Sequence, residues 1–161
     1  MKPKSTLRVF NEAEVQAGPG VVQGQTLKPL AGDDAHSSER ITVRLASFKP
    51  GTLEHLHWHL IEVFYYVISG RAIMRDIGGN SYPIGPGSAI YAPPGIAGSH
   101  EWEIQEPLQL ISIRATTDPE KMIQFTVDKT TQESKIEFDY LIEKWSPIQE
   151  VALLIDRKAH V

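Results

Sequence analysis

The chain has 161 residues, and 16 Lys or Arg against 20 Asp or Glu give a formal net charge of −4 at pH 7. This length suits one domain, so we expect a single domain over residues 1–161. An acidic balance without a run of Lys or Arg argues against a nucleic-acid partner. No apolar stretch approaches the roughly 18 residues that a membrane-spanning helix needs, so we expect no membrane partner either.

The chain contains no cysteine. This excludes disulfides, thiolate nucleophiles and sulfur-ligated metal sites, so any metal must bind to His, carboxylate or water. The N-terminal residues 1–5 are basic, but no apolar segment of the signal-peptide kind follows them, which favours a cytoplasmic location.

In chain order, an irregular N-terminal segment over residues 1–39 contains short edge strands at 7–10 and 21–30. Runs of β-branched and aromatic residues between Gly and Pro turns then predict five strands, at 41–48, 55–68, 72–76, 88–92 and 108–115. Five strands at this close spacing predict an all-β barrel or sandwich with its core at about 40–115.

The C-terminal extension, residues 116–161, is harder to interpret. Residues 123–127 look extended. Ser134 and Glu137 have the spacing of a helix capping box, so we expect a short helix there. The alternation of Ile136, Phe138 and Tyr140 also fits a strand.

Three of the six histidines, His55, His57 and His59, stand at alternate positions. Alternate residues share one face of a strand, so their imidazoles can converge on one cation. Neutral imidazole nitrogens suit iron, nickel, cobalt, copper or zinc better than magnesium or calcium. The competing interpretation is a row of solvated histidines on an edge strand.

This region resembles the cupin superfamily of small β-barrels, whose motifs read G-x5-H-x-H-x(3,4)-E-x6-G and G-x5-P-x-G-x2-H-x3-N. The matching positions are Gly51, His57, His59 and Gly70 in the first motif and Gly87, Pro93 and Gly95 in the second. The resemblance covers about residues 40–115. It implies a single cupin double-stranded β-helix, or jelly roll, with edge strands and a short C-terminal helical or extended tail. It also implies a homodimer that forms through strand exchange or sheet extension.

Two of the four residues that bind metal in this family are displaced here. Val63 stands at the glutamate position, and Glu62, one residue earlier, falls on the opposite face of the strand. Gly98 stands at the second-motif histidine position, and His100 lies two residues later, on the same face. We therefore expect a metal site made of His57, His59, His100 and His55.

An alternative registration uses His55, His57 and Glu62, which retains a carboxylate ligand.

Strand parity also places Tyr65 on the histidine face, where it is a candidate to orient a substrate oxygen or to donate a proton. The simpler interpretation is a barrel tyrosine bonded to backbone. Glu62 is the second candidate for handling a proton.

The remaining walls of the cavity depend on strand registers. We expect Ile41, Val43 and Leu45, with Ile73 and Arg75 from the next strand, to line these walls. Arg44 and Arg71 read as solvated side chains, and either can meet a substrate anion at the mouth of the barrel.

These features predict a metal-dependent enzyme that acts on a small molecule. A mononuclear non-haem dioxygenase is the first choice, because three neutral histidines can hold Fe²⁺ with open positions for substrate and O₂. Zn²⁺, Ni²⁺, Mn²⁺, Co²⁺ and Cu²⁺ are alternatives, and the same pocket can catalyse a redox-neutral isomerase, lyase or decarboxylase reaction.

An ion without a carboxylate ligand keeps its full charge and favours an anionic or chelating substrate. The alternative from another class is a non-catalytic sensor or binding cupin, which the missing motif glutamate supports.

Overall fold

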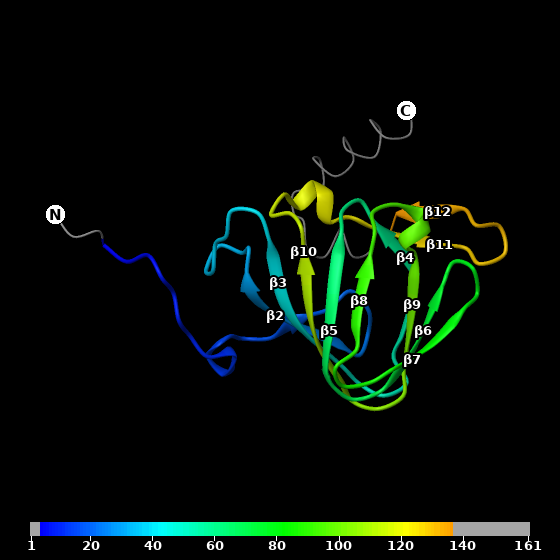
Figure 1. Ribbon diagram of the computed structural model, residues 1–161, viewed down its shortest axis with the longest axis horizontal. Coiled ribbons are helices and arrows are strands. Elements are labelled where there is room, and N and C mark those ends of the chain that lie inside the picture. The colour runs from blue at the N-terminus through cyan, green and yellow to red at the C-terminus, as the bar shows by residue number, and fades with distance from the viewer. Residues whose placement is uncertain (1–3, 137–161) are drawn as a thin grey trace.

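The computed structural model describes residues 4–136, and the regular structure of this part is strands joined by turns and three short 3-10 helices. Two antiparallel six-stranded sheets face each other (Figure 1). The first sheet has the strand order β1 (Gly18–Pro19), β2 (Gln25–Ala31), β3 (Thr42–Phe48), β10 (Leu108–Arg114), β5 (Val63–Ser69), β8 (Ala89–Ala92). The second has the order β12 (Ser134–Ile136), β11 (Gln124–Val127), β4 (Leu53–His59), β9 (His100–Ile104), β6 (Ala72–Asp76), β7 (Ser81–Ile84).

The expected all-β jelly roll is confirmed, and the differences from the expected strands are local. The long run 55–68 is two strands, β4 and β5, separated by a turn around Glu62. The strands β7 and β9 lie outside the five expected strand ranges, although the placement of His100 on a strand face already implied a strand there. No strand forms at 7–10, and this N-terminal arm extends away from the barrel (Figure 1). No helix among residues 4–136 has the length and apolarity needed to span a membrane.

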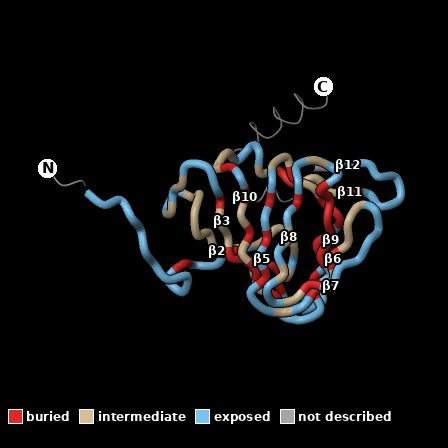
Figure 2. The backbone as a smooth tube through the Cα atoms, in the orientation of Figure 1, coloured by how far each residue is buried: buried red, intermediate tan, exposed pale blue. Residues whose placement is uncertain are grey.

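The core lies between the two sheets, where buried positions concentrate (Figure 2). Alternate residues of β5 and β10 point inward, so Val63, Val67, Leu108 and Leu110 all belong to one buried cluster. Trp102, which is 1% exposed, packs with them from the second sheet. Burying an aliphatic side chain of this size stabilises the fold by roughly 1.5–3 kcal/mol.

The expected wall of Ile41, Val43 and Leu45 is wrong, because β3 has the opposite register. The expected inward position of Ile73 and Arg75 is wrong for the same reason, since Ala72 and Met74 are the core residues of β6. Arg44, Ala46 and Phe48 line the interior, whereas Leu45 is not part of the interior core. The cause is the period-two alternation of a strand, in which a change of one position exchanges the two faces. Arg44 therefore faces the interior, while Arg71 is exposed.

The tail is extended where the structure describes it. The 3-10 helix η3 (Pro119–Met122) follows β10, and β11 pairs with β4. The expected helix at Ser134 is wrong over its first three residues, because they form β12 and pair with β11. The rest of that prediction, from residue 137 onward, lies outside the described residues.

Candidate metal centre

Three histidines from two neighbouring strands meet inside the barrel. His57 and His59 lie on β4, and His100 lies on β9 as the direct Cα partner of His57. One ring nitrogen from each lies within 4.8 Å of the other two. The three residues are 1–3% exposed, so the cluster is part of the interior and not a row of solvated side chains.

Backbone carbonyls hold two of these rings in a defined orientation. Nδ1 of His57 donates to the carbonyl of His55 at 2.7 Å, and Nδ1 of His100 donates to that of Gly98 at 2.8 Å. With the proton on Nδ1, the Nε2 lone pair is available to an ion, which is the arrangement that metal-binding histidines use.

The protonation state of the cluster also suits a cation. Burial lowers the pKa of His57 to about 4 and the pKa of His100 to about 3. Burial, with the Arg114 charge as the second cause, holds the pKa of His59 well below its ordinary value. All three imidazoles are therefore neutral near pH 7, the form that binds metal. The donor set fits a transition ion.

His55 does not join this cluster. A register shift between Glu54 and His57, where β4 pairs with β9, interrupts the regular alternation of the strand. A bulge of this kind changes which residues face inward. His55 is exposed, whereas Glu54 and His57, three positions apart, are both buried.

Glu62 also lies apart from the cluster. It is exposed in the turn between β4 and β5, and Val63 after it is fully buried, as the expected strand parity requires. The buried carboxylate near the imidazoles is instead Glu54, whose Oε1 lies 3.7 Å from Nε2 of His57. Gln124 Nε2 donates to the same oxygen at 3.4 Å, and burial raises the pKa of Glu54.

Tyr65 faces the cluster from the opposite sheet. Its hydroxyl lies 3.0 Å from Nε2 of His100, the nitrogen that is not bonded to backbone. Burial raises the pKa of Tyr65, so the hydroxyl keeps its proton and acts as a hydrogen-bond donor. Of the expected site residues, the structure thus brings together His57, His59, His100 and Tyr65.

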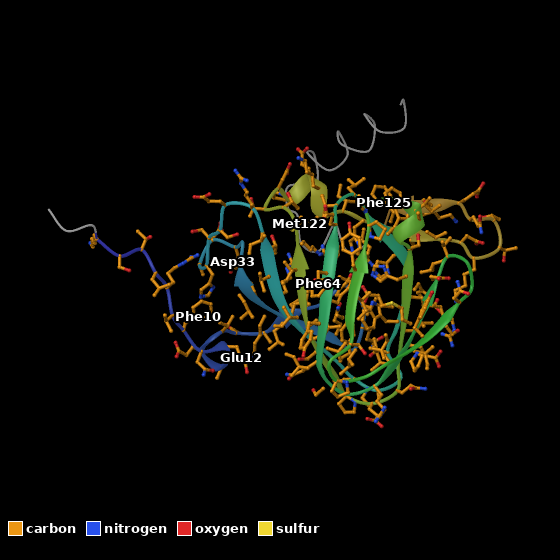
Figure 3. All side chains as sticks on the ribbon, in the orientation of Figure 1. Phe10, Glu12, Asp33, Phe64, Met122 and Phe125 are labelled. Atoms are coloured by element: carbon orange, nitrogen blue, oxygen red, sulfur yellow. The ribbon has the colours of Figure 1, made fainter. Side chains whose placement is uncertain are left out.

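Arg114, at the end of β10, contributes a positive charge beside the imidazoles. It is 7% exposed, its Nη2 approaches Nε2 of His59 at 3.5 Å, and its Nη1 donates to the carbonyl of Met122 at 3.3 Å. Met122 lies at the end of the barrel where η3 follows β10 (Figure 3).

Close packing explains the glycine at the second-motif histidine position. Gly98 ends the 3-10 helix η2 (Ile96–Gly98), and a Cβ atom there would lie 2.0 Å from the carbonyl oxygen of Pro93. Position 98 therefore accepts no side chain without a backbone shift. Its carbonyl group serves the site by orienting His100.

A pocket of about 520 Å³ reaches the cluster from the side of the barrel. It lies between β7 and β8, which are the last strands of the two sheets. The walls combine apolar and polar side chains, including Met74, Tyr82, Ile84, Ile90, Ser99 and His100. This volume is typical of small-molecule sites.

Three polar residues of the site were not expected from the sequence: Glu54, Arg114 and Gln124. Arg114 had a signal, since Leu108, Leu110, Ser112 and Arg114 alternate on β10. Glu54 had none, because nothing in the residue pattern marks the bulge that turns it inward. Gln124 depends on the pairing of β11 with β4.

Residues 44–114 match the family model described as the cupin domain. This region, which contains most of the barrel and all three clustered histidines, is therefore a cupin domain. Among curated proteins, none is similar enough in sequence to match it.

Solved structures share the fold at low sequence identity. The polyketide cyclase RemF from Streptomyces resistomycificus is 20% identical, with a TM-score of 0.58, over 68% of this chain and 79% of that chain. A cupin-superfamily sugar phosphate isomerase from Silicibacter pomeroyi is 18% identical, with a TM-score of 0.57, over 81% and 94%. The salicylate 1,2-dioxygenase from Pseudoaminobacter salicylatoxidans is 12% identical, with a TM-score of 0.51, over 59% of this chain and 26% of the dioxygenase. These similar structures therefore include different enzymes on one barrel fold.

Proposed function

We propose that this cupin is a metal-dependent enzyme that acts on a small molecule, with His57, His59 and His100 as the ligands of the ion. The observation that carries the proposal is the convergence of three buried, neutral imidazoles within 4.8 Å of one another. A buried cluster of this kind has little structural purpose, because apolar side chains fill a core at lower cost. His55, which is exposed, is not proposed as a ligand.

A bound divalent ion would supply Lewis acidity to a substrate oxygen and, in the case of Fe²⁺, electrons for a reaction with O₂. The chain itself supplies a base and a hydrogen-bond donor. The Glu54 carboxylate, buried beside His57, is suited to take a proton from a substrate carbon acid, since burial strengthens it as a base. The Tyr65 hydroxyl is suited to donate a hydrogen bond to a substrate oxygen.

Within this class we propose a dioxygenase-type oxidoreductase. Three neutral ligands leave coordination positions for both a substrate and O₂, and the cluster found in the described part of the chain consists of histidines alone. Iron-loaded protein should consume O₂ in an oxygen electrode with a member of a 1,3-dicarbonyl, catechol and flavonoid panel. His57→Ala, treated in the same way, should not. An absence of uptake across the panel would count against the oxygenase.

A redox-neutral isomerase, lyase or decarboxylase is the second candidate. The presence of both Glu54 and Tyr65 at one cavity favours it. One group accepts a proton and the other donates a hydrogen bond, which is sufficient for proton transfer next to a carbonyl. Protein loaded with Zn²⁺, Ni²⁺ or Mn²⁺ and incubated without O₂ should then exchange the acidic C–H of a carbonyl compound with deuterium from D₂O. Exchange unchanged in Glu54→Gln would argue against this role.

The pocket between β7 and β8 supports a small molecule as the partner. Its volume of about 520 Å³ accommodates a compound the size of a substituted ring system. His100 lines this pocket and also belongs to the cluster, so a substrate there lies next to the proposed ion.

A further inference from the structure

Two arginines face one small cavity in the barrel interior. Arg44 on β3 and Arg114 on β10 lie on paired strands, where Arg44 is the Cα partner of Ser112 and Arg114 that of Thr42. Both line a cavity that Glu54 and Tyr65 also line. Met122 contacts both guanidinium groups, through its sulfur 3.9 Å from Arg44 Nη2 and through its carbonyl oxygen at Arg114.

Each guanidinium has an unused donor. Nη1 of Arg44 and Nε of Arg114 are buried atoms without a hydrogen-bond partner. Neither arginine forms an ion pair with a residue in the range 4–136, although five other arginines and lysines of this range do. Buried polar groups are normally paired, so two unpaired donors at one cavity indicate a missing acceptor.

The charges around the cavity also indicate that an anionic partner is missing. Arg44 and Arg114 contribute two positive charges, and Glu54 is the carboxylate that lines the cavity with them. A divalent ion at the neighbouring histidines would add two more. Arg114 is buried and Arg44 is partly buried, and an excess of positive charge in such surroundings is costly unless an anion compensates it.

We propose that Arg44 and Arg114 bind the carboxylate group of the substrate, which makes the substrate a small carboxylic acid. This inference rests on the proposed function, because Arg114 Nη2 lies 3.5 Å from Nε2 of His59 and thus beside the proposed ion. The planar guanidinium fork matches a carboxylate better than other cations do. The cavity has a volume of about 20 Å³, more than the roughly 10–15 Å³ that one water needs, which suits a carboxylate group and not the body of a substrate.

The test measures the binding of acetate to the full chain by isothermal titration calorimetry at constant ionic strength. EDTA-treated protein is used, so that acetate has no ion to bind. Acetamide, which has the same shape without the charge, is the first control, and chloride is the second. We expect saturable binding of acetate, with at least tenfold weaker binding of acetamide and chloride.

Two variants assign this binding to the arginines. Arg114→Met and Arg44→Met should each weaken acetate at least tenfold, whereas Arg71→Met, at an exposed arginine on the surface, should leave it unchanged. Circular dichroism and the melting temperature establish which variants fold, and either folded variant is sufficient. Unchanged acetate affinity in a folded variant would overturn the proposal, as would equal binding of acetamide. Preferential binding of chloride would overturn the substrate class by indicating a site for a free halide.

Metal content separates this inference from the proposed function. Arg114→Met should retain the metal-to-protein ratio of the unmodified protein after reconstitution, since its side chain is not a proposed ligand. If acetate fails to bind while the histidine site still takes up metal, the carboxylate site is wrong and the metal site stands. If no metal binds to either protein, the proposed function itself fails.

Discussion

His57 and His100 are Cα partners across β4 and β9, and the centroids of their imidazole rings lie 4.4 Å apart. Each ring has Nδ1 bonded to a backbone carbonyl two residues earlier in the chain. The pair is therefore held by the backbone of two strands and does not depend on the ion for its orientation. Such preorganisation lowers the cost of binding a metal.

We expect His57→Ala and His100→Ala to lose stoichiometric metal after reconstitution, because each change removes one of three ligands. Plasma mass spectrometry on tag-free protein gives the metal-to-protein ratio. His55→Ala is the matched control on the same strand, since its side chain is exposed and outside the cluster. Equal metal in His57→Ala and His55→Ala would remove the basis for the proposed ligand set.

Glu54→Gln should stabilise the metal-free protein at neutral pH, by about 1 kcal/mol. Burial raises the pKa of Glu54, so the carboxyl stabilises the folded state below that pKa and loses this contribution as the pH rises through it. Glutamine keeps the shape without the buried charge. Urea unfolding measures the difference, and Glu62→Gln, at an exposed position, should change little. If Glu54→Gln were less stable than the unmodified protein, the surroundings of Glu54 would stabilise its ionised carboxylate more than the observed contacts indicate.

The buried imidazoles should make the metal-free protein less stable in mild acid. In the unfolded chain the pKa of a histidine is about 6.5, whereas in the folded chain the pKa of His57 is about 4 and that of His100 about 3. Between about pH 6.5 and 4 the unfolded state binds more protons, so stability falls as the pH is lowered. The effect of His57 alone is on the order of 3 kcal/mol across this window.

This loss is measured by urea unfolding of EDTA-treated protein at about pH 7.5 and about pH 5. His57→Gln removes one of the titrating groups and should reduce the difference between the two conditions. If the free energy of unfolding changed equally between the two pH values in His57→Gln and in the unmodified protein, His57 would be protonated in the folded state at the lower pH, contrary to its burial.

The outer face of the first sheet favours a homodimer that packs face to face, a different arrangement from the strand exchange or sheet extension that the resemblance implies. Two cross-strand rows of uncharged side chains run over β3, β10, β5 and β8, and the members of each row are paired by register. They are Val43, Ile113, Phe64 and Tyr91, then Leu45, Ile111, Tyr66 and Ala89. Phe64 is 38% exposed and Tyr66 is 47% exposed. The two rows themselves carry no charge, and Lys28 of β2, which continues the second row beside Leu45, is paired with Glu12. Uncharged rows fit an identical copy across a twofold axis, since no like charges oppose each other there.

We expect a dimer by size-exclusion chromatography with light scattering, and a monomer for Phe64→Glu. Leu53→Glu is the control, because Leu53 has a similar exposure of 40% and lies on the second sheet. A monomeric unmodified protein would contradict the predicted dimer.

The sequence predicted the barrel because its signals are local. Strand parity is a local property, and it correctly separates buried Val63 and Tyr65 from exposed Glu62 and Phe64. The inward position of His100 followed from the same parity. The exclusion of His55 and the inclusion of Glu54 depend on the β4 bulge, which arises from pairing with β9 and leaves no trace in the alternation of residues. Register between strands was equally out of reach, so Arg44 was assigned to the wrong face.

The packing of Gly98 against Pro93 constrains how this barrel can change. A Cβ atom at position 98 would collide with backbone, and backbone cannot move aside as the end of a flexible side chain can. Restoring the ordinary motif by exchanging Gly98 and His100 would therefore require the whole turn before β9 to be rebuilt. The displaced histidine is thus an entrenched feature of this chain, reversible only through several coordinated substitutions.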